Sequence, residues 1–260
     1  MAPHAVTNGS TDQNAPRERR IVTVLVTGFE PFQERYPINP SYEIAKSLPS
    51  KLSTSDTEIH IIAYGTPIRV SYAEVHKLVP LMHESYSQSV DLVLHMGMAS
   101  GRTFYTAEMY GHRDGYIKNK DLDGNILPAD DGIRHFGDCP AMMTTSLDYD
   151  DVFRKWQSNL LQLPTSLPAY GADCRASEDA GHYLCDYTYF NSLAWYGRRN
   201  NSPDGGKVSD RPVMFLHVPA ETDQDTLEKG KHITMALIKA MADHWSQSVA
   251  CNSSMNEKQY

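Results

Sequence analysis

The hydrophobic pattern of this chain switches repeatedly between the period of strands and that of helices. Strands are predicted where β-branched and apolar residues cluster over a short run, at residues 21–27, 58–64, 90–96, 170–176 and 213–218. Helices are predicted where apolar residues recur every three or four positions, at residues 39–48, 70–84, 151–163, 186–196 and 222–245. This alternation predicts an α/β domain with a mainly parallel sheet and helices on both faces.

Local signals refine three of the helices. Asn39 before Pro40 is a good helix start, because Asn caps free N–H groups and Pro suits the first turn. Pro80 predicts a kink or an early end in the second helix. Thr222 and Asp225 resemble a capping box for the last helix. The Gly- and Asp-rich segment 108–140 fits no element.

The two ends of the chain differ from the middle in composition. Residues 1–20 are polar and aperiodic, so we predict a disordered tail there, a single domain over 21–246 and a flexible tail over 247–260. The N-terminus lacks the apolar centre of a signal peptide, and no apolar run reaches the roughly 18 residues that a membrane span needs. We therefore expect a cytoplasmic protein without a membrane partner. The net charge of −8 argues against nucleic acid as a partner.

The cysteines and glycines suggest neither a metal nor a cofactor. Four cysteines without a CxxC pair are better interpreted as thiols than as disulfides or zinc ligands. The glycines at 97–101 match neither the dinucleotide-binding turn nor the Walker loop. We expect no cofactor and no metal.

Residues suited to catalysis follow the predicted strands. Glu108 comes after the loop at 97–102, Cys185 precedes a helix, and His217 lies near the end of the last strand. Sites in such folds gather at the carboxyl ends of strands, so the three side chains can meet there. A free thiol has a pKa of about 8.5, and an imidazole held by a carboxylate is what converts it to a nucleophile. Each residue also has an ordinary interpretation, as a buried thiol, a core histidine or a solvated acid.

Four motifs, in order along the chain, resemble the pyroglutamyl-peptidase I family, also called pyrrolidone-carboxylate peptidases. The resemblance runs from about Val22 to Trp245, and the third motif is closer to the eukaryotic members. The motifs are residues 27–32 with 39–41, residues 97–102 with Glu108, residues 177–185, and residues 217–219.

The resemblance implies a fold, a reaction and a set of site residues. The fold would be a three-layer α/β/α sandwich with a mainly parallel, mixed sheet. The reaction would be hydrolysis of the amide bond after an N-terminal pyroglutamyl residue of small peptides, through a thioester and without cofactor or metal. Cys185 would be the nucleophile, His217 the general base and acid, and Glu108 the acid that orients it. The residues assigned to the substrate are Phe29 and Phe32 around the lactam ring, Asn39 with a binding or structural role, and Tyr183 and Leu184 beside the thiol.

Some positions depart from the family pattern and keep two alternatives open. Met109 stands where many bacterial members have Arg, and Glu178 and Asp179 place two acids near the thiol, which should raise its pKa unless a partner offsets them. The polar run 198–211 is interpreted as a surface insertion, and segment 108–140 matches poorly, so bacterial oligomer contacts are not carried over. The alternatives are a Cys-dependent amidase of other acyl preference and a non-catalytic pyroglutamyl-peptide binder.

Overall fold

A seven-stranded mixed sheet forms the centre of the molecule. The computed structural model describes residues 19–256, and the order of strands across the sheet is β2-β3-β1-β4-β9-β5-β8. The strands are β1 (Arg20–Thr27), β2 (Lys51–Ser53), β3 (Thr57–Ala63), β4 (Leu92–Met98), β5 (Tyr105–Glu108), β8 (Cys174–Ser177) and β9 (Val213–Val218). β3, β1, β4 and β9 run parallel to one another, whereas β2 pairs antiparallel with β3 and β5 pairs antiparallel with β9. The predicted mainly parallel, mixed sheet is confirmed.

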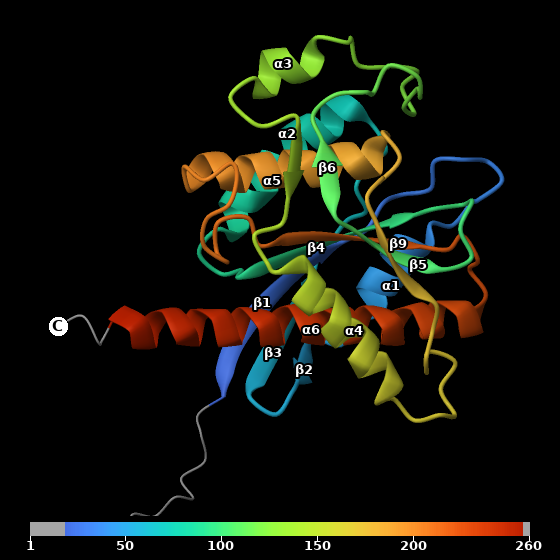
Figure 1. The fold of residues 1–260 in the computed structure, drawn as a ribbon. Coiled ribbons are helices and arrows are strands. Elements are labelled where there is room, and N and C mark those ends of the chain that lie inside the picture. Colours follow the sequence, from blue (N-terminus) through green and yellow to red (C-terminus); the bar gives the residue numbers. More distant parts are fainter. Residues whose placement is uncertain (1–18, 257–260) are drawn as a thin grey trace, which may run out of the picture.

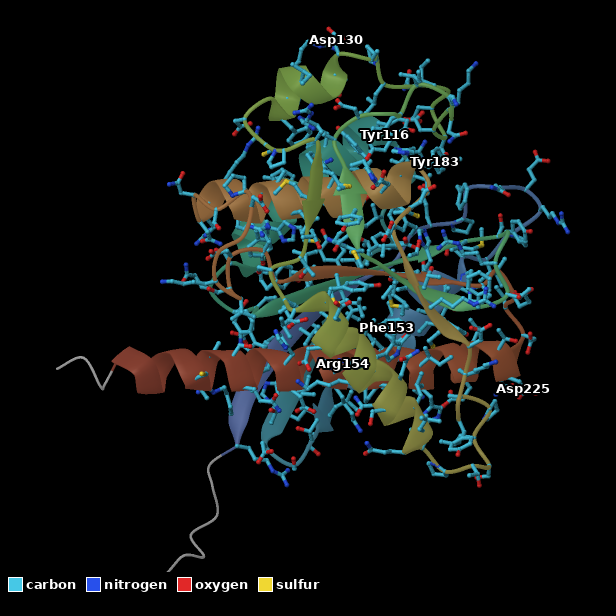
Figure 2. All side chains as sticks on the ribbon, viewed as in Figure 1. Tyr116, Asp130, Phe153, Arg154, Tyr183 and Asp225 are labelled. Atoms are coloured by element: carbon cyan, nitrogen blue, oxygen red, sulfur yellow. The ribbon has the colours of Figure 1, made fainter. Side chains whose placement is uncertain are left out.

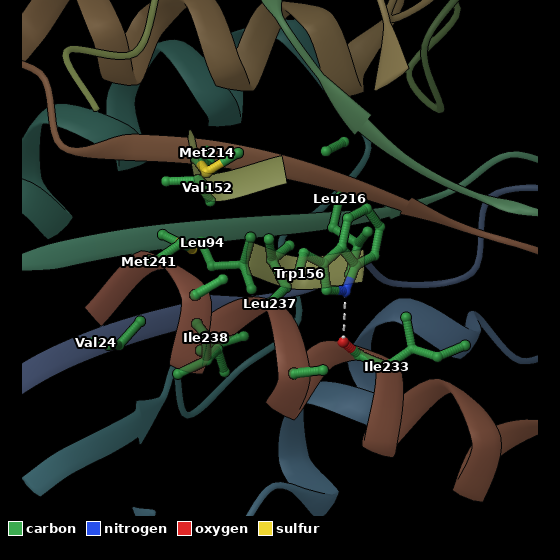
Figure 3. Packing of buried hydrophobic residues seen from close by; sticks show 14 of the residues in the cluster. Val24, Leu94, Val152, Trp156, Met214, Leu216, Ile233, Leu237, Ile238 and Met241 are labelled. Carbon is green, nitrogen blue, oxygen red and sulfur yellow. Dashed lines mark hydrogen bonds between the residues drawn. The ribbon is translucent and has the colours of Figure 1, made fainter. Parts of the chain in front are cut away.

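Helices cover both faces of the sheet, which gives three layers (Figure 1). One face is covered by α1 (Pro40–Ser47), α4 (Tyr149–Leu161) and α6 (Gln224–Asn256). Their apolar stripes pack on the alternate residues of β1, β4 and β9 that point to this side. Trp156 is fully buried there, and its indole N–H donates to the carbonyl of Ile233 at 3.0 Å (Figure 3). The one polar group of the largest side chain in this core therefore has a hydrogen-bond partner.

The opposite face is covered by α2 (Tyr72–Tyr86) and α5 (Leu184–Arg199), with α3 (Asp131–Phe136) beyond them. A second, two-stranded sheet, β6 (Tyr110–His112) with β7 (Met142–Thr144), packs against α5. This core is rich in tyrosines: Tyr72 contacts the rings of both Tyr116 and Tyr183, and the latter two lie above the sheet on the side of α5 (Figure 2). The aromatic layer supports one wall of the pocket described below.

Most predicted elements are confirmed, and two local expectations are corrected. Asn39 caps α1 by accepting from the backbone N–H of Ser41. α2 does not end early at Pro80 but continues to Tyr86. At the start of α6, Asp223 rather than Thr222 accepts the N–H of Thr226. The segment 108–140 contains the end of β5, then β6 and α3, which are too short to produce a readable period.

The ends of the domain differ in part from the expected boundaries. The expected tail at 1–20 lies almost entirely outside the described residues, although β1 already begins at Arg20. α6 runs to Asn256 and so continues past the expected end of the domain at 246. Among the described helices, none combines the length and apolar character needed to cross a membrane.

Candidate active site

The site is built on one face of three adjacent strands. Gly97 of β4 is the register partner of His217 in β9, and His217 is the partner of Thr106 in β5. Side chains alternate between faces along a strand, so His217 follows Phe215 onto the face covered by α5, and Glu108 follows Thr106 onto it. Strand pairing therefore brings Glu108 and His217 together although they lie far apart in the sequence.

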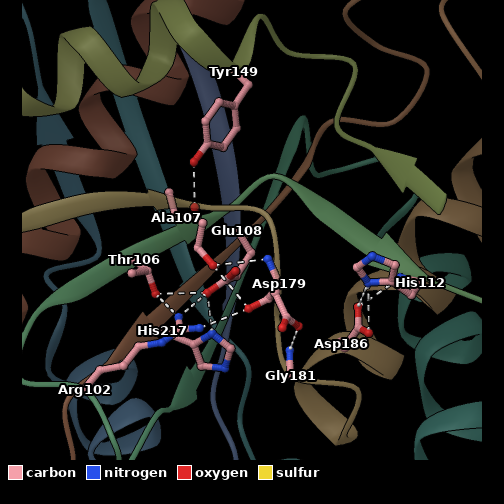
Figure 4. A network of polar contacts seen from close by, with 11 residues as sticks. Arg102, Thr106, Ala107, Glu108, His112, Tyr149, Asp179, Gly181, Asp186 and His217 are labelled. Carbon is pink, nitrogen blue, oxygen red and sulfur yellow. Dashed lines mark hydrogen bonds and ion pairs between the residues drawn. The ribbon is translucent and has the colours of Figure 1, made fainter. Parts of the chain in front are cut away.

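Glu108 and His217 form a buried acid–imidazole pair. His217 Nδ1 donates to Glu108 Oε1 at 2.8 Å, and the Glu108 carboxylate is completely inaccessible to solvent (Figure 4). The same oxygen also accepts from Arg102 at 2.6 Å and from the hydroxyl of Thr106 at 2.9 Å. Burial raises the pKa of Glu108, but the hydrogen bond and charge of His217, helped by Arg102, outweigh it and leave the pKa below its ordinary value. The carboxylate is thus held ionised, with the Nε2 side of the imidazole left for another partner.

Cys185 is that partner. It is the second residue of α5, in the first turn, where backbone N–H groups have no partner within the helix. Burial lowers the pKa of His217, but the charge of Cys185 and hydrogen bonds to Cys185 and Glu108 raise it to about 9. An imidazole of this kind holds its proton near neutral pH when it faces a thiolate. The arrangement is that of an activated thiol with an oriented base.

Gly97 leaves the space that the thiol occupies. A Cβ added at Gly97 would lie 2.6 Å from Cys185 Sγ and 2.9 Å from the ring of Phe215. Any other residue here would displace the thiol or the ring, because real contacts of this type are longer than 3 Å. Gly97 is inside β4 and does not mark a loop, so its role is close approach and not a turn.

A pocket of about 720 Å³ opens above these residues. Cys185 and His217 line it, whereas the fully buried Glu108 does not. All five predicted substrate residues line it as well: Phe29, Phe32, Asn39, Tyr183 and Leu184. Phe32 and Tyr183 contact each other at a tilt, with ring centroids 5.9 Å apart. Leu184 and Phe29 are nearly inaccessible, so they form the deeper apolar surface. The volume suits a small ligand.

Asn39 reaches this pocket, but its polar atoms bond within the protein. Its carbonyl oxygen accepts from the backbone N–H and the hydroxyl of Ser41, and its amide donates to the carbonyl of Glu30 at 3.1 Å. The hydroxyl of Ser41 in turn lies 3.1 Å from the N–H of Phe29, which donates to it. Asn39 thereby fixes the loop that carries the two phenylalanines.

Comparison with known proteins identifies the family. The pyroglutamyl peptidase family profile matches residues 22–244. Pyroglutamyl-peptidase 1 of Homo sapiens is 30% identical over 232 residues, which cover 86% of this chain and 92% of the relative. The chain belongs to the pyroglutamyl peptidase family. The pyrrolidone-carboxylate peptidase of Thermosipho africanus is 27% identical, covering 91% of this chain and 98% of the relative.

Solved structures of the family share the fold. The pyrrolidone carboxyl peptidase of Thermococcus litoralis superposes with a TM-score of 0.66 at 23% identity, over 87% of this chain and 96% of that chain. A mutant of the Pyrococcus furiosus enzyme superposes with a TM-score of 0.65 at 20% identity, over 85% and 99% of the two chains. The predicted α/β/α fold and family membership are both confirmed.

The structure corrects the sequence interpretation of where the site residues lie. His217 lies in a strand as expected, whereas Glu108 ends the strand β5, which was not predicted and which pairs with the strand of His217. Lys118, Asn119 and Lys120 also line the pocket, although they were not predicted there. Their segment has no hydrophobic period to place it; it is held by Tyr183, whose hydroxyl donates to the carbonyl of Lys120 at 3.0 Å.

Two of the departures from the family pattern, Met109 and Asp179, have defined contacts in the structure. Met109 packs against the core on the α4 and α6 side, and its N–H donates to the carbonyl of Ser177 at 2.7 Å. Asp179 turns its carboxylate to the N–H of Gly181, while its carbonyl accepts from Arg102, so one cation connects this loop with Glu108. The polar run 198–211 ends at buried Arg211, whose guanidinium donates to the carbonyls of Ser202 and Gly205 in this run and to that of Thr144 in β7.

Proposed function

We propose that this protein hydrolyses the amide bond after an N-terminal pyroglutamyl residue of small peptides, with Cys185, His217 and Glu108 as its catalytic group. The observation that carries the proposal is one pocket that contains both the thiol and the imidazole and is walled by aromatic rings. Family membership supports the reaction class. Cys185 is the nucleophile, His217 transfers protons, and Glu108 positions and charges the imidazole.

The charge of the pocket favours a blocked N-terminus. Its described lining contains Arg102, Lys118 and Lys120 but no Asp or Glu. A free α-ammonium group needs a carboxylate or a metal, and it would meet cations here. A pyroglutamyl ring is uncharged, so it can pack against the aromatic surface that Phe32 and Tyr183 form on the pocket wall without such a partner.

The residues support a two-step reaction. The Cys185 thiolate attacks the pyroglutamyl carbonyl carbon and forms a C–S bond, while His217 gives its proton to the leaving amine as the C–N bond breaks. His217 then takes a proton from water, the resulting hydroxide attacks the thioester, and the C–S bond breaks to release pyroglutamate and the thiolate. The free backbone N–H of Cys185 in the first turn of α5 is a donor for the oxyanion.

A panel of fluorogenic amides tests the reaction and its specificity. Reduced, folded protein should cleave the pyroglutamyl amide and leave the corresponding prolyl and glutaminyl amides nearly untouched. Cys185→Ala should abolish cleavage, whereas Cys251→Ala, which changes an exposed thiol on α6, should retain it. Faster turnover of the prolyl or glutaminyl amide would favour an amidase of other acyl preference. Tight pyroglutamyl-peptide binding without turnover would favour a non-catalytic binder.

We also propose a cytoplasmic location. Cys139 and Cys174 are buried as thiols, and no disulfide joins cysteines of the described residues. This pattern suits a reducing compartment. Cell fractionation with an antibody against the chain tests it, and recovery in a secreted or organelle fraction would contradict it.

A further inference from the structure

Two histidines and an aspartate meet on the far side of the nucleophile's helix start. His112 ends β6, His182 lies in the loop before α5, and Asp186 is in the first turn of α5. One ligand-capable atom from each lies within 4.8 Å of the others. The Asp186–His112 pair lies apart from the network of His217 and Glu108 (Figure 4), and within the described residues no hydrogen bond or ion pair joins the two groups.

The Asp186 carboxylate accepts the backbone N–H of His112 at 2.9 Å, whereas the two imidazoles beside it make poorer contacts. The Asp186 carboxylate is completely inaccessible, yet within the described chain its ion pairs are with the two imidazoles and with no Lys or Arg. His112 Nδ1 lies 3.2 Å and 3.3 Å from the two carboxylate oxygens, which is longer than a charge-assisted hydrogen bond of about 2.7–2.9 Å. His182 Nδ1 is a buried atom without a hydrogen-bond partner in the described residues.

The spacings fit the coordination shell of a metal ion. Zinc binds imidazole nitrogen and carboxylate oxygen at about 2.0–2.1 Å in a tetrahedron, so neighbouring ligand atoms lie about 3.3 Å apart. Asp186 Oδ2 is 3.2 Å from His112 Nδ1 and 3.3 Å from His182 Nδ1. The imidazole rings have centroids 4.7 Å apart, and the three candidate ligand atoms all lie within 4.8 Å of one another.

The backbone holds His182 in place for this role. His182 has a φ of 42°, a left-handed conformation that is uncommon outside glycine. Gly115, itself at a φ of 108°, faces the imidazole, and a Cβ there would lie 2.8 Å from His182 Nδ1. Strain of this kind persists where the surroundings impose it, and it is often found at ligand sites.

We propose that His112, His182 and Asp186 bind a divalent transition-metal ion such as zinc. Three protein ligands leave a fourth position for water, and the partly exposed imidazoles give the ion a path from solvent. The ion would connect β6 to the residues on both sides of Cys185 and so fix the loop that carries the nucleophile. The absence of a CxxC pair gave no hint of this site, because its ligands come from two distant segments and include no cysteine.

Metal binding is tested in the Cys185→Ala protein, which removes the thiol that would otherwise compete for zinc. Zinc titration calorimetry should give one equivalent bound. Cobalt should give the visible absorption of a tetrahedral ion without a sulfur-to-cobalt charge-transfer band. His112→Ala and His182→Ala should each weaken binding by about 10-fold or more. A control that loses two histidines outside the cluster, His60→Ala with His232→Ala, should bind as the parent does.

Thermal unfolding provides a second readout. Zinc at about a hundredfold excess over its Kd should raise the Tm of the parent by about 5–10 °C and leave that of His182→Ala nearly unchanged. His182 is partly exposed, so its variant should fold, and its circular dichroism without metal checks this. No binding by the parent, or equal binding after both histidine substitutions, would overturn the proposal. A charge-transfer band in the Cys185→Ala protein would place the ion on another cysteine and also overturn it.

Discussion

Gly97→Ala should remove activity while leaving the fold in place. The added methyl would lie 2.6 Å from Cys185 Sγ and 2.9 Å from Cζ of Phe215. Ordinary carbon contacts are about 3.5–4.0 Å, so the thiol has to move by roughly 1 Å. A displacement of that size at a reacting atom lowers kcat by about 100-fold.

The effect on stability should be much smaller than the effect on activity. Overpacking a core position costs about 1–3 kcal/mol, which lowers the Tm of a domain of this size by roughly 2–12 °C. Below that Tm the variant should therefore stay folded, so a loss of kcat at 25 °C reports geometry and not unfolding.

Gly65→Ala is the matched control, because an added Cβ there meets nothing within 4 Å. Both variants are assayed for kcat and KM on the fluorogenic pyroglutamyl amide, and circular dichroism and Tm are measured in parallel. Gly65→Ala should match the parent. Full activity of folded Gly97→Ala would show that the thiol does not need the space above β4, and would refute the reasoning.

Three further changes should have separable effects. Glu108→Gln removes a charge that raises the pKa of His217, so kcat should fall by about 10- to 100-fold and the alkaline limb of the kcat/KM profile should move to lower pH; an unmoved limb would contradict this. Phe32→Ala should raise KM by about 10-fold with a smaller change in kcat, and an unchanged KM would argue against its place in the ring site. Burial lowers the pKa of His95 to about 3, so the unfolded chain binds the extra proton below about pH 6.5 and stability should fall by about 2 kcal/mol from pH 7 to pH 5. Urea titrations at the two pH values check this, with His95→Asn expected to lose less.

The sequence predicted the layers of the fold better than it predicted the geometry of the site. Long segments such as α6 and β1 can be predicted from their own sequence, because each buries a continuous apolar face and so shows a clear hydrophobic pattern. β5 has only four residues, all of them buried, so its antiparallel pairing with β9 was not predictable from period. That pairing is what buries Glu108 beside His217.

Other parts of the site depend on contacts between distant segments. The role of Gly97 follows only from its close approach to Cys185, because a glycine in the sequence alone is equally consistent with a turn. Lys118 and Lys120 reach the pocket because hydrogen bonds from side chains such as Tyr183 hold their segment. Motif order identified Cys185, but only the pairing of β5 with β9 explains why Glu108 and His217 meet beside it.

Residue-level alkylation tests the central claim, that Cys185 is the nucleophile. The reduced protein is treated with a limiting amount of iodoacetamide, and samples are taken over time for activity and for peptide mapping of all four cysteines. The fraction of Cys185 modified should equal the fraction of activity lost, and a saturating pyroglutamyl peptide should slow both. Loss of activity with Cys185 unmodified, or full activity with Cys185 completely modified, would contradict the account.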